Sequence, residues 1–214
     1  SWGPIALIVI FQPEIRTVLE QIGRSKIFGG ISFGNMSRNE ETYIKECKNL
    51  VNIVADAVFS LSDEKMGALI VFEKKTKLDE IIDTGTLIKA KPSVPLICNI
   101  FYTKTPLHDG ALIVKDNLLY AGGCILPLTK NPEIKKEFGT RHRAAIGTSE
   151  NSDAVVVVVS EETGKISLVI NGIIKRYDNM NTFKSELKEL LIDGIETSKH
   201  QNIFTSLRKG RNND

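Results

Sequence analysis

The segment Ala154–Ser160, AVVVVVS, is the strongest indication of fold in this chain. It is a short run rich in β-branched residues, and turn-forming residues follow it. Such runs are typical of strands that are buried on both faces of a sheet. Ile166–Ile170, ISLVI, comes after the turn EETGK, so we expect the two runs to pair as a hairpin. The centre of the domain is therefore predicted to be a β-sheet.

Three other apolar runs have the same character, and turn residues bound each of them. They are Gly67–Phe72 (GALIVF), Val94–Tyr102 (VPLICNIFY) and Ala111–Lys115 (ALIVK). Asn117 predicts a turn that brings ALIVK back into LLYAGGCILPL. Helical patterns stand between these runs, at Lys77–Asp83, Pro132–Phe138 and Thr182–Leu191. We therefore expect an α/β fold with a mixed central β-sheet flanked by helices.

A long helix is predicted before the first strand. Ser37 and Glu40 have the spacing of a capping box, which marks a helix start. Apolar residues then recur at helical spacing, at Ile44, Cys47, Val51, Val54 and Val58. This pattern predicts a helix of about five turns.

The start of the chain is predicted to lie outside the domain. Pro13–Arg24 has the pattern of a short amphipathic helix, and the glycine-rich stretch Phe28–Met36 indicates a flexible connection. The apolar residues 1–11 are fewer than the roughly 20 that span a bilayer. They are either a buried lead-in helix or the end of a membrane helix. The expected parts are a lead-in and linker at 1–36, the domain at 37–196 and a polar tail at 197–214.

Charge and cysteine content argue against two classes of protein. The 28 basic and 26 acidic residues give a net charge of +2, too balanced for a general nucleic-acid-binding surface. Any anion site must therefore be local. Cys47, Cys98 and Cys124 are odd in number and far apart, which fits neither a disulfide framework nor a common metal site. A reducing, cytosolic setting fits this usage best.

The first candidate motif is Pro106–Ala111, PLHDGA. Asp109 can take a cation or a hydroxyl proton, and Gly110 lets a ligand approach the backbone because it has no Cβ. His108 beside Asp109 adds an imidazole, and this pair suits Mn²⁺ or a related ion. An ordinary turn is the alternative, since Asp-Gly is among the commonest turn pairs.

The second candidate motif is Gly139–Arg143, GTRHR. Arg141 and Arg143 carry planar guanidinium groups that bind phosphate oxygens at two points. Backbone amides at a glycine turn or helix start add further donors, as does the hydroxyl of Thr140. The motif thus indicates phosphate binding, with a solvated basic patch as the alternative.

The third candidate motif is formed by Ser160, Glu161 and Glu162, directly after the valine run. Ligands of open α/β sheets bind at strand ends, so a carboxylate here could complete a metal site with Asp109. Ser160 could hydrogen-bond a ribose or a phosphate. The alternative is a solvated hairpin tip.

Taken together, the three motifs resemble the diadenylate cyclase domain, and closely the membrane-anchored type of many Gram-positive bacteria. The resemblance extends from about Arg24 to Leu191. It includes the segments FQPEIR, KTPLHDGA, GCILPL and GTRHRAAIG.

The resemblance assigns roles to individual residues. It implies a catalytic set of Asp109, Gly110, Arg141, His142 and Arg143. The implied ATP-binding residues are Thr140, Ser160, Glu161, Ile125, Leu126, Gly110 and Ala111. The implied metal ligands are Asp109, His108 and Glu162. Some relatives place an aromatic residue against adenine where this chain has Ile125, so here the base would be held by dispersion from Ile125 and Leu126.

The resemblance also implies a reaction and its setting. Two ATP molecules would condense into 3′,5′-linked cyclic di-AMP, releasing two pyrophosphates. The ribose 3′-hydroxyl of one ATP attacks the α-phosphate of the facing ATP, with help from a divalent metal, Mn²⁺ before Mg²⁺ or Co²⁺. Because each site would hold one ATP, a homodimer is expected. The expected location is the cytoplasmic face of the bacterial membrane, with a membrane-linked regulator and phosphoglucosamine mutase as further partners.

Two other functions fit some of the same residues. A non-catalytic nucleotide sensor would use the same phosphate donors, although Asp109 and the glutamates argue against it. A nucleic-acid-binding regulator would use the arginines together with the basic tail residues Lys199, Arg208, Lys209 and Arg211. The balanced charge argues against this second function, and no nucleic-acid partner is expected.

Overall fold

The computed structural model describes residues 33–132 and 138–192. The chain divides between Glu41 and Thr42 into two compact units, and the sheet belongs to the second. Residues 1–11, the predicted helix Pro13–Arg24 and the tail at 197–214 lie outside the described residues. So does most of the predicted helix Pro132–Phe138.

A seven-stranded mixed sheet forms the centre of this unit. Its strands are β1 (Ala68–Phe72), β2 (Thr86–Ala90), β3 (Ala111–Lys115), β4 (Leu118–Cys124), β5 (Val155–Val159), β6 (Ile166–Ile170) and β7 (Ile173–Tyr177). They are ordered β2-β4-β3-β1-β5-β6-β7. β1 and β3 are parallel, and all other neighbours are antiparallel. The predicted α/β class with a mixed sheet is confirmed.

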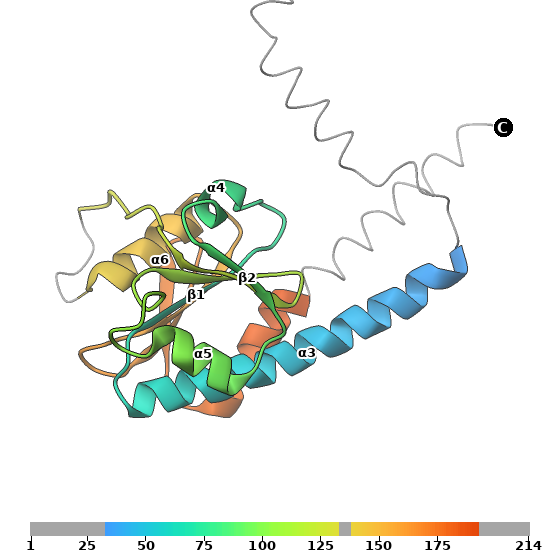
Figure 1. The fold of residues 1–214 in the computed structure, drawn as a ribbon, viewed down its shortest axis with the longest axis horizontal. Helices are drawn as coiled ribbons and strands as arrows, with labels where there is room; N and C mark the ends of the chain where they lie inside the picture. Colours follow the sequence, from blue (N-terminus) through green and yellow to red (C-terminus); the bar gives the residue numbers. More distant parts are fainter. Residues whose placement is uncertain (1–32, 133–137, 193–214) are drawn as a thin grey trace, which may run out of the picture. The chain divides into compact units, whose positions relative to one another are not determined.

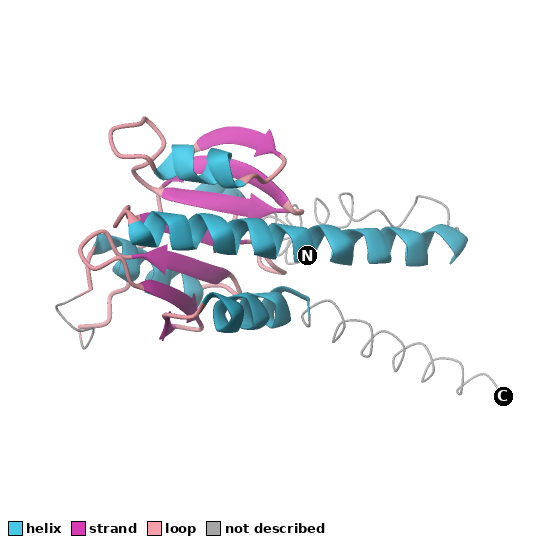
Figure 2. Cartoon of the chain, turned by 90° about the horizontal axis from the view of Figure 1, so that it is seen from below, coloured by secondary structure: helices cyan, strands magenta, loops and turns pink. Residues whose placement is uncertain are grey.

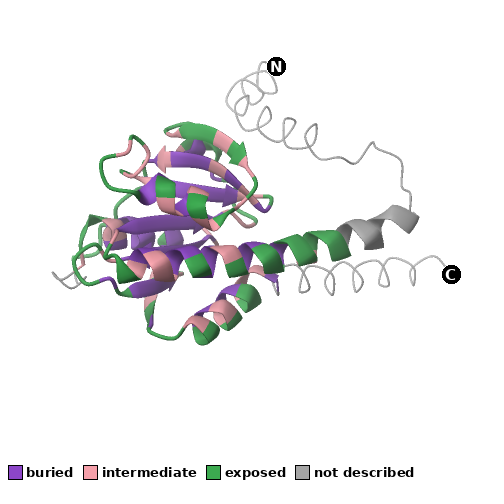
Figure 3. Cartoon of the chain, turned by 60° about the horizontal axis from the view of Figure 1, so that its bottom comes forward, coloured by how far each residue is buried: buried purple, intermediate pink, exposed green. Residues whose placement is uncertain are grey.

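The valine run is the strand β5, which lies between β1 and β6. All five of its valines are buried, and it pairs with β6 as the predicted hairpin. Side chains alternate between the two faces of the sheet, so Val157 and Val158 contribute to different cores. Figure 3 shows buried residues concentrated in the strands and on one side of the long helix.

Helices cover both faces of the sheet (Figures 1 and 2). The helices α3 (Phe33–Asp63) and α5 (Val94–Phe101) and the helix over 180–192 supply one core with Ile70 and Phe72. The helices α4 (Asp79–Ile82) and α6 (Thr140–Glu150) supply the other core with Leu69 and Val71. The helical patterns predicted near α4 and near 180–192 are therefore confirmed.

The prediction of a strand at Val94–Tyr102 is wrong, because this segment forms the helix α5. The hydroxyl of Ser93 caps the helix by accepting a hydrogen bond from the Leu96 N–H at 3.4 Å. Proline in the first turn suits a helix start, and Ile97, Ile100 and Phe101 form its buried side. A short apolar run can be either a strand or a buried helix, and here the cap decides the outcome.

The boundaries of α3 also differ from the prediction. The helix begins at Phe33 and has 31 residues, so it starts inside the predicted connection and includes Ser37 in its interior. Two edge strands, β2 and β7, were not predicted from the sequence. Both are partly exposed and lack a continuous buried run, so their pattern is weaker than that of a central strand.

The strand directions place the ends of four strands together. The start of β1, the start of β3 and the ends of β4 and β5 lie at one end of the sheet, which we call the Gly67 end. The end of β1, the end of β3 and the β3–β4 turn lie at the opposite end, which we call the Lys74 end.

Candidate functional site

Two adjoining cavities lie at the Gly67 end of the sheet. The polar cavity has a volume of about 420 Å³ and is lined by Gly139, Thr140, Arg141, His142, Val159, Ser160, Glu161 and Glu162. The apolar cavity has a volume of about 300 Å³ and is lined by Leu69, Asp109, Gly110, Cys124, Ile125, Leu126, Leu128, Thr140, Arg141 and Ala144. Thr140 and Arg141 line both, so the two cavities are neighbours.

The first turn of α6 brings backbone donors to this site. Gly139 is the residue before the helix, and no side chain caps the N–H groups of the first turn. That turn also contains no acidic residue. Uncapped N–H groups and the positive end of the helix dipole favour an anion at this position.

Arg141 reaches the site from the first turn of α6. Its Nη1 donates a hydrogen bond to Oε2 of Glu161 at 2.5 Å, and the guanidinium is largely sheltered from solvent. Gly67 makes room for this pair, because a Cβ there would lie 2.8 Å from Arg141 Nη1 and 3.0 Å from Glu161 Cβ. The missing side chain of Gly67 therefore sets where the guanidinium lies.

His142 is buried at the floor of the polar cavity. Its ring stacks on Phe138, with the ring centroids 5.2 Å apart. Burial lowers the pKa of His142, the positive charge of Arg176 lowers it further, and Glu162 opposes both effects. The imidazole is therefore neutral at neutral pH and can donate one hydrogen bond without adding a charge.

Asp109 and Gly110 stand in front of β3, on the wall of the apolar cavity. Gly110 has a φ of +115°, and a Cβ there would lie 2.7 Å from the carbonyl carbon of Gly123. Glycine is thus needed for the backbone conformation and for the close approach of β4. This reason adds to the one from the sequence, which was that a glycine lets a ligand approach the backbone. The carboxylate of Asp109 is exposed.

His108 lines neither cavity, although it is next to Asp109. Its Nδ1 lies 2.6 Å from the carbonyl oxygen of Thr105. A carbonyl can only accept, so Nδ1 carries a proton and Nε2 is the ring nitrogen left to bind a metal. This is the tautomer in which a histidine binds metal through Nε2.

The three residues implied as metal ligands do not form a preformed cluster. Within residues 41–132 and 138–192, no group of three or more His, Cys, Asp or Glu residues could hold a metal ion. Asp109 lies in the apolar cavity and Glu162 in the polar cavity. A metal at Asp109 and His108 would therefore need further oxygen ligands, such as those of a bound phosphate.

Besides His108, two further residues implied by the resemblance line neither cavity. Arg143 is half-buried, and its Nε donates to the Phe138 carbonyl oxygen at 3.4 Å. Ala111 is fully buried in β3. Ser160 does line the polar cavity, but its hydroxyl accepts a hydrogen bond from the Thr163 N–H at 3.2 Å.

The wall of the apolar cavity includes large exposed side chains. Ile125 is 70% exposed and Leu128 is 54% exposed, so this wall presents apolar side chains to the surroundings. Burial raises the pKa of the Cys124 thiol in this wall to about 11, so the thiol stays protonated at neutral pH. The cavity thus offers apolar contact rather than a reactive thiolate.

Sequence reasoning missed several residues of the site. Gly67, Leu69, Leu128 and Ala144 line it or shape it, and the hydroxyl of Thr84 accepts a hydrogen bond from the Ile125 N–H at 2.9 Å. The sequence offered one signal for Gly67, which is its position directly before a buried strand. The other four required knowledge of the sheet order.

Comparison with known proteins finds chains that are similar to this one. The family model described as the DisA bacterial checkpoint controller nucleotide-binding domain matches residues 55–174. The cyclic di-AMP synthase CdaA of Bacillus subtilis (strain 168) is 41% identical over 191 residues, covering 89% of this chain and 66% of that protein. The diadenylate cyclase of Listeria monocytogenes serotype 1/2a (strain 10403S) is 38% identical over 213 residues, covering 99% of this chain and 74% of that protein.

A solved structure agrees with these sequence matches. The crystal structure of a double mutant of DacA from Staphylococcus aureus has a TM-score of 0.67 and 42% sequence identity. The match covers 69% of this chain and 99% of that one. The chain therefore belongs to the diadenylate cyclase family, a family of nucleotidyltransferases.

Proposed function

We propose that this chain condenses two ATP molecules into 3′,5′-linked cyclic di-AMP and releases two pyrophosphates. The observation that carries the proposal is the junction of the two cavities at Thr140 and Arg141. One cavity supplies apolar surface for a base, and the other supplies cationic and N–H donors for phosphates. A nucleotide has the same two parts, in the same order along its length.

Each residue type then has a physical task. The N–H groups of the α6 first turn, Arg141 and the neutral His142 would bind the phosphates and stabilise the charge of the departing pyrophosphate. Arg141 must exchange its contact with Glu161 for the triphosphate, or share it. Ile125 and Leu126 would hold the adenine by dispersion in place of an aromatic ring. Positioning and charge stabilisation are sufficient, because no covalent intermediate is required.

A divalent metal is part of the proposal. Asp109 and the Nε2 of His108 would hold it together with oxygens of the bound nucleotide. Glu162 lines the other cavity and would become a third ligand only after its side chain moves toward Asp109. The resemblance implies Mn²⁺ before Mg²⁺ or Co²⁺, and a carboxylate with an imidazole can bind any of the three. When bound, the metal would lower the pKa of the attacking 3′-hydroxyl and neutralise charge on the α-phosphate. Asp109 contributes negative charge at the point where the hydroxyl loses its proton.

Catalysis is proposed to occur across a homodimer. The chain has one copy of each motif, so one subunit would present one ATP, whereas the product contains two adenylates. The exposed Ile125 and Leu128 beside the site provide apolar surface that a second copy would cover. A two-fold arrangement would present each 3′-hydroxyl to the facing α-phosphate.

The setting of the whole protein follows from the resemblance. We propose that it works at the cytoplasmic face of the bacterial membrane, with a membrane-linked regulator and phosphoglucosamine mutase as partners. No helix among residues 33–132 and 138–192 is long and apolar enough to cross a membrane. The limits 1–36, 37–196 and 197–214 stay a prediction.

The proposal is tested by incubating the protein with ATP and Mn²⁺ and identifying the product by mass spectrometry. Cyclic di-AMP with two equivalents of pyrophosphate is expected, and ATP binding without product would indicate a sensor instead. Specific activity should also rise with protein concentration until the dimer is saturated. A flat specific activity at concentrations where sedimentation detects only monomer would exclude the two-subunit mechanism.

A further inference from the structure

A third cavity lies at the Lys74 end of the sheet, away from the proposed nucleotide site. It has a volume of about 340 Å³, near the lower limit for ligand pockets, which is roughly 300 Å³. Its floor is mainly apolar and is built from Tyr43, Cys47, Leu50, Phe72, Val114 and Leu191. Its rim carries Lys74, Lys75 and Lys77, together with Glu73 and Asp116. We call it the lysine-rimmed pocket.

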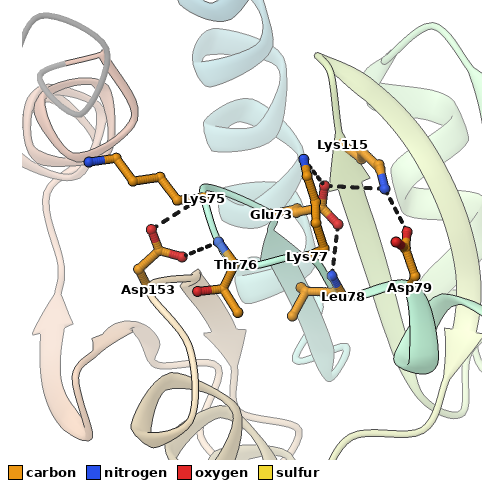
Figure 4. A network of polar contacts seen from close by, with 8 residues as sticks. All are labelled: Glu73, Lys75, Thr76, Lys77, Leu78, Asp79, Lys115 and Asp153. Atoms are coloured by element: carbon orange, nitrogen blue, oxygen red, sulfur yellow. Dashed lines mark hydrogen bonds and ion pairs between the residues drawn. The ribbon is translucent and has the colours of Figure 1, made fainter. Parts of the chain in front are cut away.

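The one deeply buried carboxylate of this rim is already neutralised. The side chain of Glu73 is only 2% exposed. It accepts hydrogen bonds from Lys77 Nζ at 3.1 Å and from the Leu78 N–H at 2.9 Å, and it pairs with Lys115 Nζ at 3.2 Å (Figure 4). Glu73 therefore holds the loop after β1 in place and leaves the outer lysines to set the charge of the rim.

The backbone donors of the same loop are also in use. The N–H groups of Lys75 and Thr76 donate to the two carboxylate oxygens of Asp153 at 3.1 and 2.9 Å (Figure 4). Phosphate sites are usually built from backbone N–H groups and arginine forks. Among the described residues no arginine lines this pocket, and these two N–H groups are already bonded, so it is less suited to a nucleotide than the Gly67 end.

What the rim does offer is flexible positive charge above an apolar floor. Within the described residues, no carboxylate lies within ion-pair distance of the ammonium groups of Lys74 or Lys75. Lys74 is also half-buried, whereas Lys75 is exposed. An apolar socket with a charged rim is the arrangement of an anchor site in a protein interface.

We propose that the lysine-rimmed pocket binds an acidic peptide segment of a protein partner. One bulky apolar side chain of that segment would fill the floor between Phe72 and Leu191. Carboxylates on either side of it would pair with Lys74 and Lys75. The strands β1 and β3 separate this pocket from the Gly67 end, so a partner could dock here while both nucleotide cavities stay open.

The test uses the ¹⁵N-labelled chain and the blocked peptide Asp-Glu-Phe-Glu-Asp. We expect saturable NMR shifts of the backbone amides around Phe72–Lys77 and Val114–Asn117. The double variant Lys74→Glu/Lys75→Glu should weaken binding about tenfold, because it replaces attraction with repulsion on both sides of the anchor. Replacing the peptide's Phe by Ala should weaken binding about tenfold as well.

A matched control is available on the same unit. Lys45 is exposed on α3, two residues from both Tyr43 and Cys47, so it points away from the pocket. Lys45→Glu should leave peptide affinity within about twofold of the parent. Leu191→Trp, which fills the floor, should block the peptide, and circular dichroism would verify that each variant is folded.

Three outcomes would overturn the proposal. The first is the absence of saturable shifts up to about 10 mM peptide, because a specific site of this kind would have a Kd below that concentration. The second is equal affinity of the parent and the Lys74→Glu/Lys75→Glu variant. The third is displacement of the peptide by AMP, or by a second copy of the chain in a concentration-dependent manner, since either would name a different occupant.

Discussion

The two ends of the sheet both gather positive charge, but they do so with different chemistry. At the Gly67 end, the cation that lines the cavities is an arginine, and the first-turn N–H groups of α6 have no side-chain cap. At the Lys74 end, the cations are lysines, and the N–H groups of the loop are bonded to Asp153 and Glu73. The donors at the two ends therefore suit different anions, phosphate at the Gly67 end and carboxylate at the Lys74 end in our proposals.

This contrast shows that charge alone does not identify a nucleotide site. A count of basic residues would favour the Lys74 end, where three lysines line one cavity. The geometry of the donors favours the Gly67 end, because planar guanidinium groups and free N–H groups match phosphate oxygens. The predictions below test whether that distinction governs activity.

The largest expected effect comes from Asp109→Asn. The variant keeps the shape of the side chain but removes the charge that would hold the metal, so cyclase activity should fall at least about a hundredfold. Asp116→Asn makes the same change at the Lys74 end and should leave activity unchanged. Mass spectrometry of the product gives the rate for both. Near-parental activity in Asp109→Asn would remove this residue from the catalytic set.

Arg141→Lys should have the next largest effect. It conserves charge but loses the two-point contact with phosphate, so kcat/KM for ATP should fall about tenfold or more. Lys74→Arg is the reverse exchange at the other end, and we expect no change in kcat/KM. Identical kinetics in parent and Arg141→Lys would support a solvated basic patch at α6.

A smaller loss is expected from Gly67→Ala. The added Cβ would push the Arg141 guanidinium and Glu161 apart from their present positions, and we expect ATP affinity to fall about fivefold. Gly139→Ala is the control in the same cavity, because a Cβ there meets no atom within 4 Å. Isothermal calorimetry with a non-hydrolysable ATP analogue would compare them. Equal losses in both variants would mean that Gly67 does not position Arg141.

The smallest effect is a pH dependence of stability that differs between the two ends. Folding lowers the pKa of His142 below 6.5, so its contribution to stability is present above that pH and is lost as the pH falls below it. Burial would raise the pKa of Asp153, but hydrogen bonds from Thr76 and Lys75 lower it below 3.8 overall. Its contribution is therefore lost only at more acidic pH.

Thermal unfolding at several pH values separates these two contributions. His142→Gln should reduce the loss of thermal stability as the pH falls below 6.5. Asp153→Asn should reduce the loss of thermal stability as the pH falls below 3.8. An unchanged profile near pH 6.5 in His142→Gln would mean that the histidine is not held neutral by its surroundings.

The central strands were predictable from sequence because they are buried on both faces. The valine run and GALIVF contain no polar side chain, and ALIVK has only Lys115 at its end, so their pattern is direct. The edge strands β2 and β7 mix polar and apolar residues, and α5 depends on a cap at Ser93 rather than on periodicity. Those elements could not be read from local pattern alone.

The sequence could predict that a motif residue lies at an end of the sheet only where its backbone placement follows from the local pattern. Thr140 and Arg141 share a helix turn, and Asp109 precedes a strand, so local reasoning brings each motif to a sheet end. That Asp109 and Glu162 occupy different cavities depends on the order β4-β3-β1-β5, which is a long-range property. The Arg141–Glu161 contact and the space left by the missing side chain of Gly67 also depend on this long-range strand order.

The position of β5 also has a consequence for how the protein is made. Five uncharged, β-branched residues in a row are the kind of segment that pairs with other chains when it is exposed. In the folded unit both long sides of β5 are paired, with β1 and with β6. A chain truncated between Val159 and Ile166 would contain β5 but lack β6, so one long side of the strand would be left unpaired. Truncated products that end in this turn are therefore expected to aggregate when the protein is overproduced.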